Sequence, residues 1–183
     1  MIEKILESFF KVDNFEKKGP NISTEKLNGG EKVKLNYDSI YKGESTELTT
    51  RNSNLEGQKH PETGVAFERK EVETTEGIKE GVFPQFDSLF NAELPEELEK
   101  ASDREQFKEC NVQLKENVEH NSELKEKFTV EQLEQIEDKE TPDGYTWHHS
   151  EETGKMQLVE SGVHAKTGHT GGKSIWGGGT ENR

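Results

Sequence analysis

The stretch 144-GYTWHHSEETGKMQLVESGVHAKTGHTGG-172 decides the predicted fold of this chain. "GYTWHH" and "KMQLVES" have the composition of short strands, and "SEETGK" between them predicts a turn centred on Gly154. "GVHAKTGHTGG" begins as a short helix or an open loop. The predicted order is therefore strand, turn, strand, helix.

Four of the six histidines of the chain lie in this stretch: His148, His149, His164 and His169. A divalent metal of intermediate softness needs imidazole or carboxylate ligands that usually come from more than one element. Because successive side chains of a strand point to opposite faces, His148 and His149 cannot bind one ion without a bulge. One of the two is expected to bind the metal, while the other acts as a general base near pH 7.

The segment after the second strand supplies the rest of the predicted site. His164 is expected to complete the metal site from the helix. His169 follows five residues later, about 140° away around an ideal helix, so it becomes a ligand only if the helix ends or distorts near Gly168. Two other interpretations of the cluster stay open, namely a purely structural zinc site and a cluster without a role.

The most regular secondary structure precedes this stretch. Ser102 and Glu105 form a predicted capping box, and the helix that follows repeats apolar side chains on one face. Those side chains are Phe107, Cys110, Leu114 and Val118. Thr129 and Gln132 form a second predicted capping box, which opens another short helix.

Residues 65–83 predict a β-hairpin, because alternating apolar residues stand on both sides of a Glu-Gly turn. Three phenylalanines in and after it are expected in the core: Phe83, Phe86 and Phe90. Residues 1–18 carry apolar side chains at helical spacing. Residues 21–57 are polar and glycine-rich, which predicts a linker with two weak strands.

Composition limits the functional classes. The 183 residues are 27% hydrophobic and 34% charged, which predicts a small core. The net charge of −14 argues against a general nucleic-acid binder. Residues 141–183, however, hold four basic and five acidic side chains, so the repulsive field is weakest at the histidines. The single cysteine, Cys110, excludes an internal disulfide and a multi-cysteine zinc site, and we expect neither a signal peptide nor a membrane-spanning helix.

Four motifs together resemble a known family. "GYTWHH", "GKMQLV", "VHAKTGHTGG" and "IWGGG" are similar to the WHH branch of the HNH/endonuclease superfamily, whose members are nuclease domains at the C-terminal tips of bacterial polymorphic toxins. The resemblance is close over residues 141–179 and extends over 58–183. We therefore expect a nuclease domain over 58–183 with its catalytic core over 141–179, preceded by a variable junction segment over 1–57.

The resemblance implies an α+β fold with a C-terminal ββα-metal core, in which two antiparallel strands and a helix surround one divalent ion. It implies that His149 is the general base and that His148 and His164 bind the metal. His169 is implied to be a third ligand or a contact to the scissile phosphate. The identity of the ion stays open among zinc, magnesium, manganese and nickel.

Three further residues receive roles. Gln157 lies near the position where many HNH enzymes place an asparagine that orients the base, so the resemblance implies an orienting role for it. Lys166 and Lys173 are expected to hold the phosphates that flank the scissile one. No set of base-reading side chains is visible, which predicts cleavage that is largely independent of sequence.

The leading hypothesis is a metal-dependent DNA endonuclease that acts as an antibacterial toxin and is neutralised by a cognate immunity protein. Such a toxin is made in the bacterial cytoplasm, exported, and active in the cytoplasm of a target cell. Three alternatives stay open: the same site acting on RNA, a zinc-stabilised binding module, and an acidic immunity-like protein that mimics DNA. A site closed by four protein ligands favours the binding module, whereas an unligated histidine beside an open metal position favours the nuclease.

Overall fold

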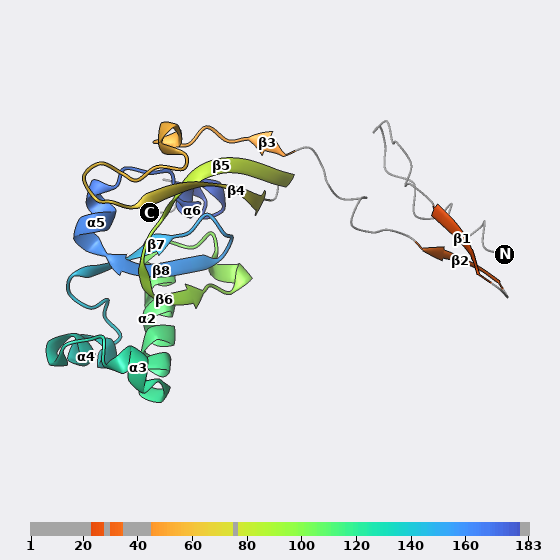
Figure 1. Cartoon of the computed structure of the whole chain (residues 1–183). Coiled ribbons are helices and arrows are strands. Elements are labelled where there is room, and N and C mark those ends of the chain that lie inside the picture. Colours follow the sequence, from red (N-terminus) through yellow and green to blue (C-terminus); the bar gives the residue numbers. More distant parts are fainter. Residues whose placement is uncertain (1–22, 28–29, 35–44, 75–76, 180–183) are drawn as a thin grey trace. The chain divides into compact units, whose positions relative to one another are not determined.

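A computed structural model describes residues 23–27, 30–34, 45–74 and 77–179 (Figure 1). The chain separates into two compact units, residues 1–42 and 43–183. In the first unit the described residues form an antiparallel hairpin of β1 (Ser23–Leu27) and β2 (Gly30–Lys34). The helix predicted over residues 1–18 lies outside the described residues.

The second unit is a mixture of helices and strands, which confirms the predicted α+β class. Its strands are β3 (Thr46–Glu47), β4 (Ala66–Thr74), β5 (Gly77–Gln85), β6 (Ser88–Glu93), β7 (Tyr145–His149) and β8 (Lys155–Glu160). Its α-helices are α2 (Asp103–His120), α3 (Ser122–Lys125), α4 (Val130–Glu137), α5 (Ser161–Lys166) and α6 (Gly172–Ile175). Short 3-10 turns span Ser53–Leu55 and Glu96–Leu98. Among the described residues, none of the helices combines the length and the apolar character that crossing a membrane requires.

The strands of this unit form two three-stranded sheets. In one sheet, in the order β3-β5-β4, β4 and β5 pair antiparallel as the predicted hairpin. In the other, in the order β6-β8-β7, β8 is the central strand and both neighbours run antiparallel to it. No strand is predicted from the sequence at β6, because Ser88 and Asn91 interrupt the apolar alternation there. Pairing with β8 nevertheless gives β6 its strand geometry.

The predicted order of strand, turn, strand and helix is confirmed at β7, β8 and α5. Gly154 has a φ of +77°, a conformation that favours glycine in the turn between the two strands. α5 follows β8 without an intervening loop, since β8 ends at Glu160 and α5 begins at Ser161. The helix therefore packs back against β7 and β8.

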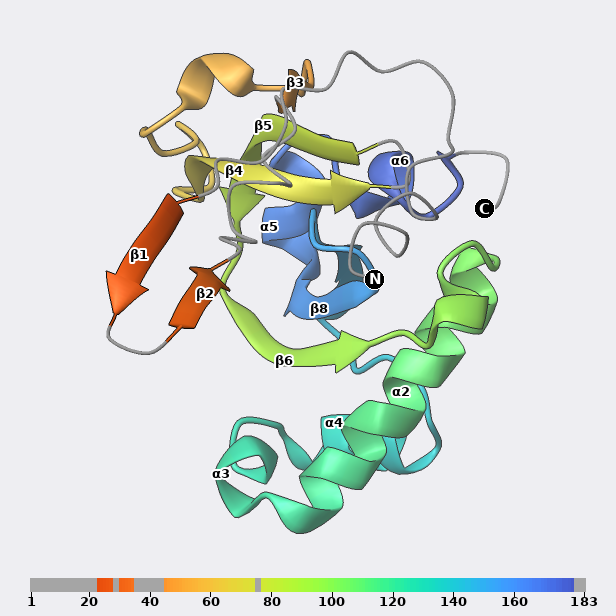
Figure 2. The same ribbon diagram turned by 90° about the vertical axis from the view of Figure 1, so that its right-hand side faces the viewer.

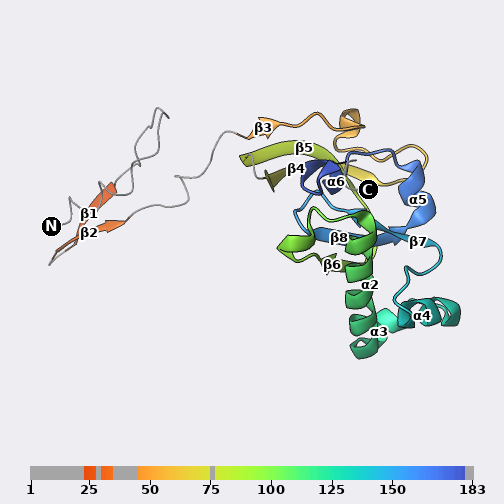
Figure 3. The ribbon, with the colours of Figure 1, turned by 180° about the vertical axis from the view of Figure 1, so that it is seen from behind.

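One face of the β6-β8-β7 sheet carries the main core. Trp147, Met156 and Leu158 point to this face and pack in one cluster with Leu114 of α2. Both predicted capping boxes are present, at the start of α2 and at the start of α4. The three views agree that α3 and α4 lie at the far end of α2 from β4 and β5 (Figures 1, 2 and 3).

The other face of the same sheet carries a smaller apolar cluster. Val159 of β8, Val163 of α5 and Phe86 pack together there. Of the phenylalanines predicted for the core, Phe83 and Phe86 are buried and Phe90 is half-buried against the main cluster. Because β7 alternates, His148 points to this second face, while His149 points to the face that α2 covers.

Residues 45–57, which the sequence analysis assigned to the junction segment, lie in the same compact unit as the sheets. The Thr50 hydroxyl donates to the carbonyl of Val82 at 2.7 Å, in a buried position. The Gly57 amide donates to the carbonyl of Phe67 at 2.9 Å. These contacts tie residues 45–57 to the sheet formed by β3, β4 and β5.

Candidate metal centre

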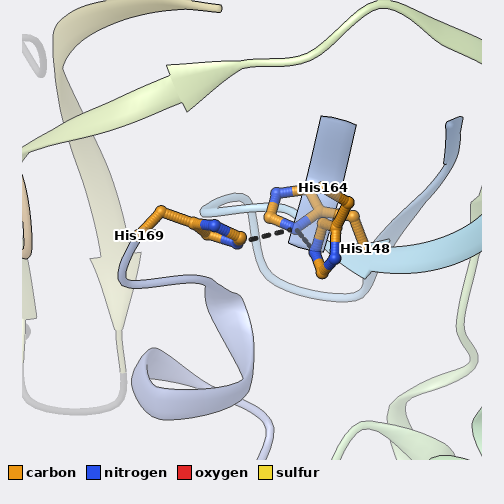
Figure 4. Close-up of side chains that lie close together, drawn as sticks. All are labelled: His148, His164 and His169. Carbon is orange, nitrogen blue, oxygen red and sulfur yellow. Dashed lines mark hydrogen bonds between the residues drawn. The ribbon is translucent and has the colours of Figure 1, made fainter. Parts of the chain in front are cut away.

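Three imidazole rings from three different elements converge on the second face of the sheet (Figure 4). His148 comes from the end of β7, His164 from α5 and His169 from the loop after α5. His148 Nδ1 lies 3.3 Å from His164 Nε2 and 3.2 Å from His169 Nε2. One ring nitrogen from each residue falls within 4.8 Å of the other two. The structure thus brings together the three residues predicted as metal ligands.

His169 joins the cluster because α5 is short. The helix ends at Lys166, and Thr167 leaves helical geometry with φ −85° and ψ 85°. The fully buried Thr167 anchors this end: its hydroxyl donates to the carbonyl of Val163 at 2.8 Å and lies 2.6 Å from the hydroxyl of Thr63. The chain then turns back toward β7, so the spacing of five residues between the last two histidines is no obstacle.

The backbone sets the tautomer of His169. Its Nδ1 lies 2.6 Å from the carbonyl oxygen of Thr167. A carbonyl can only accept, so Nδ1 carries the hydrogen and, in the neutral ring, Nε2 carries the lone pair. That lone pair points into the cluster, toward His148. A hydrogen bond from the second ring nitrogen to a carbonyl is the usual support of a metal-binding histidine.

The donor set suits a divalent ion. Two nitrogen ligands of a tetrahedral ion with metal–nitrogen bonds of about 2.0–2.1 Å are about 3.3 Å apart. His148 Nδ1 stands at that separation from both other rings. Among the described residues the group contains three protein ligands rather than four. Three is the number typical of catalytic zinc sites, which keep a position for water or substrate.

Phe86 shields the cluster from water. Its ring centroid lies 4.8 Å from that of His148, 5.5 Å from that of His164 and 5.3 Å from that of His169. Burial is the main reason why the pKa of each histidine is lowered, well below the ordinary value for His148 and to about 4 for His164. The rings also lower the pKa of His148 and of His164 by mutual repulsion. All three are therefore neutral near pH 7, the form that binds a metal.

Acid should destabilise the metal-free chain through these rings. A histidine whose pKa is lower in the folded than in the unfolded state contributes stability that is complete above about pH 6.5 and lost as pH falls through the folded value. For His164 that interval runs from 6.5 to about 4. We expect the melting temperature of EDTA-treated protein to fall by several degrees between pH 7 and pH 5. A His164→Asn variant should lose less over this interval, and a flat profile for the parent chain would contradict the burial of neutral rings.

His149 lies on the opposite face of the sheet, beneath α2. Its side chain is buried, and Nε2 lies 2.8 Å from Oε1 of Gln106. The same Oε1 accepts from Nζ of Lys173 at 3.2 Å, and Lys173 forms an ion pair with Asp103 at 2.8 Å. His149 thus belongs to a network of polar side chains from α2 and α6, separate from the three converging rings.

The structure separates the other predicted site residues from one another. The side chain of Lys166 is 63% exposed, and it forms a surface ion pair with Glu62 at 3.2 Å. The side chain of Lys173 is 9% exposed, and its ammonium group contacts Asp103, Ala101 and Gln106. This position favours a structural role for Lys173 over a contact with a substrate phosphate. Gln157 stands opposite His148 in the strand register. It therefore shares the His148 face, whereas His149 points to the opposite face, and this placement does not favour the orienting role predicted for it.

Arg51 is a neighbour of the site that sequence reasoning missed. A Cβ placed on Gly168 would lie 2.5 Å from its Cζ, so the guanidinium lies against the loop that carries His169. The Arg51 amide donates to the hydroxyl of Thr170 at 2.9 Å, and the Asn52 side chain donates to the carbonyl of Gly168. The positive charge of Arg51 contributes to the lowered pKa of His169, after burial as the main cause.

Comparison with known proteins identifies the family. No curated protein and no solved structure matches the chain. The model of one family, the DNase/tRNase domain of colicin-like bacteriocins, matches residues 74–171, which is more than half of the chain. The matched range contains the three converging rings and His149. The chain belongs to this family of bacteriocin nuclease domains.

Proposed function

We propose that the chain is a metal-dependent endonuclease of the WHH branch of the HNH superfamily, which hydrolyses DNA as an antibacterial toxin. The proposal rests on the convergence of three neutral imidazoles, those of His148, His164 and His169, in a bacteriocin nuclease domain. A fourth histidine, His149, directly follows His148 in the sequence. Such a set binds one divalent ion and leaves a coordination position for the reaction.

In this proposal His148, His164 and His169 hold the ion. When bound, a divalent ion would supply positive charge that stabilises the pentacoordinate phosphate and the departing 3′ oxygen. His149 accepts the proton of the attacking water, so the hydroxide forms as it adds to phosphorus. Phe86 packs against all three ligand rings and adds to the burial that lowers their pKa values and keeps them neutral.

Arg51 is proposed to hold a phosphate of the substrate. Within the described part of the chain no carboxylate forms an ion pair with Arg51, although acidic residues outnumber basic ones, 38 to 24, in the whole sequence. A guanidinium beside the metal ligands that is not neutralised by an acid attracts an anion, and its planar fork fits two phosphate oxygens. The acidic chain as a whole repels DNA, so this local charge gains importance.

Arg51→Ala should lower kcat/KM by about 10- to 100-fold, the usual range for loss of a charge-assisted contact. Metal affinity should stay unchanged, because Arg51 supplies no ligand. Initial rates on plasmid and calorimetric zinc binding check both statements. Lys125→Ala, which removes a positive charge from α3, serves as the matched control and should cut at the parent rate. Equal losses in both variants would mean that only net charge matters.

The proposed function is tested with the parent chain on supercoiled plasmid and on total RNA. Each substrate is incubated with EDTA or with Mg²⁺, Mn²⁺, Ni²⁺ or Zn²⁺. Nicking and linearisation of plasmid that needs a divalent ion would support a DNase. Cleavage of RNA alone would keep the mechanism and change the substrate. If neither substrate is cut with any ion while removal of zinc unfolds the chain, the cluster is a structural site in a binding module.

The biological setting is part of the same proposal. A bacteriocin nuclease acts in a target cell, so we infer that this chain is exported and works in the cytoplasm of that cell. A producing cell then needs a cognate immunity protein. Expression of the chain alone should stop bacterial growth, and co-expression with a neighbouring open reading frame should restore it if that frame encodes the inhibitor. Normal growth of cells that express the chain without any inhibitor would contradict toxicity.

A further inference from the structure

Helix α2 presents two buried carboxamides to the same face of β7. Asn111 Oδ1 lies 2.8 Å from Nε1 of Trp147, and Gln106 Oε1 lies 2.8 Å from Nε2 of His149. Trp147 and His149 stand two residues apart on the strand and therefore share this face. The indole can only donate, so Asn111 accepts from it. The question is whether the His149 ring also donates.

The amide of Gln106 can be oriented from its partners alone. Its Nε2 donates to the carbonyls of Leu98 at 2.9 Å and Glu99 at 2.7 Å. Carbonyl oxygens accept only, so this end of the side chain must be the NH₂ group. Its Oε1 accepts from the ammonium of Lys173 at 3.2 Å, and an ammonium only donates. Three independent contacts thus place the oxygen, and not the nitrogen, against His149.

We infer that Gln106 is a positioning residue that holds His149 in the tautomer with hydrogen on Nε2 and the lone pair on Nδ1. An amide oxygen has no hydrogen to give, so the ring nitrogen that faces it must carry one. Nδ1 is then the nitrogen that takes the proton from water, which leaves an imidazolium and a hydroxide. This assignment of atoms rests on the proposed function, whereas the tautomer itself does not.

The surroundings of Gln106 suit a fixed support. Gln106 is fully buried, and the four hydrogen bonds of its side chain join it to the segment before α2, to α6 and to β7. Lys173 is held in turn by Asp103 at 2.8 Å and by the carbonyl of Ala101 at 3.2 Å. Asp103 Oδ1 stands 3.9 Å from Nε2 of His149, so this carboxyl group lies beside the same ring nitrogen that faces Gln106. Lys173 therefore acts indirectly on His149 through the amide.

The test is nuclear magnetic resonance of the histidine ring nitrogens in the whole ¹⁵N-labelled chain, with Zn²⁺ added. A spectrum of His149→Ala identifies the His149 signals by their loss. In the parent chain we expect Nε2 to give the signal of a protonated nitrogen and Nδ1 that of an unprotonated one. Gln106→Leu should abolish this pattern and lower plasmid cleavage by about 10- to 100-fold. Gln106→Glu keeps an oxygen acceptor toward Nε2 of His149 and should keep the pattern, while it loses the two donated hydrogen bonds to Leu98 and Glu99 and with them some stability.

Asn111→Leu is the matched control, because it removes a buried carboxamide from the same helix that bonds Trp147 instead of His149. It should lose stability like Gln106→Leu but keep the tautomer and the cleavage rate. A parent spectrum with hydrogen on Nδ1 would overturn the inference without any variant, as would an unchanged pattern in folded Gln106→Leu. If the tautomer behaves as expected and the parent chain cuts no nucleic acid, the proposed function fails and the role of Gln106 stands.

Discussion

Replacing His148 by alanine is expected to abolish both metal binding and cleavage. His148 is the centre of the cluster, since its Nδ1 is the nitrogen that both other rings approach, at 3.2 and 3.3 Å. Without it, only His164 of α5 and His169 of the following loop remain as ligands. Two imidazoles bind a divalent ion far more weakly than three. We expect cleavage to fall by at least about 10³-fold, as when several kcal/mol of charge stabilisation are removed.

Calorimetry with Zn²⁺ and plasmid cleavage over a range of metal concentrations measure the two effects together. His120→Ala is the control, because it removes an exposed histidine at the end of α2. Circular dichroism checks that His148→Ala is folded, since the native side chain is 2% exposed and packs on Phe86. A folded variant that binds zinc with parental affinity would show that the three rings are not the metal site.

The sequence predicts the strand–turn–strand–helix part of the fold because the signals are local. A turn with Gly154 at positive φ, two capping boxes and an alternating strand each depend on a few neighbouring residues. The separation of His148 from His149 also follows from the pleat alone. The placement of His148 and His164 near one another is then a consequence of a helix that directly follows the second strand.

The rest of the site depends on contacts between distant parts of the chain. Nothing near Arg51 in the sequence marks it, because its neighbours are polar and the loop it touches comes 119 residues later at Thr170. From the sequence alone, Lys173 is expected to be an exposed surface residue. In the fold it forms an ion pair with Asp103 of α2, a contact that only tertiary structure creates. Of these three residues, only Gln106 stands out in the sequence. It stands at helical spacing with Cys110 and Leu114, so a polar side chain interrupts an otherwise apolar face.

The same distinction explains the division of the chain. Residues 45–57 have the composition of a linker, yet their backbone and side chains bond to β4, β5 and the loop after α5. Amino-acid composition indicates how much apolar surface a segment can bury. Residues 45–57 are held mainly by hydrogen bonds, which composition does not reveal. The strand β6 is a similar case, because its partner β8 lies about 70 residues away in sequence. Local alternation cannot reveal such a partner.

Replacing His149 by alanine is expected to separate binding from catalysis. His149 lies on the opposite face of the sheet from the three converging rings, so its removal leaves all three metal ligands in place. Zinc affinity should therefore stay at the parental value. Cleavage of plasmid should fall by about 10²- to 10⁴-fold, which is the usual contribution of a general base. Calorimetry and initial rates on the same preparation give the two numbers.

The comparison with His148→Ala makes this result decisive. Both side chains are buried, neighbouring and of the same type, so a general loss of packing would affect metal binding and cleavage alike in the two variants. Loss of zinc binding in His149→Ala would show that the network of Gln106, Lys173 and Asp103 supports the metal site from behind. Parental cleavage would show that water is activated without His149. Intact binding with lost cleavage is the result expected if this ring takes the proton, because the three metal ligands remain in place without it.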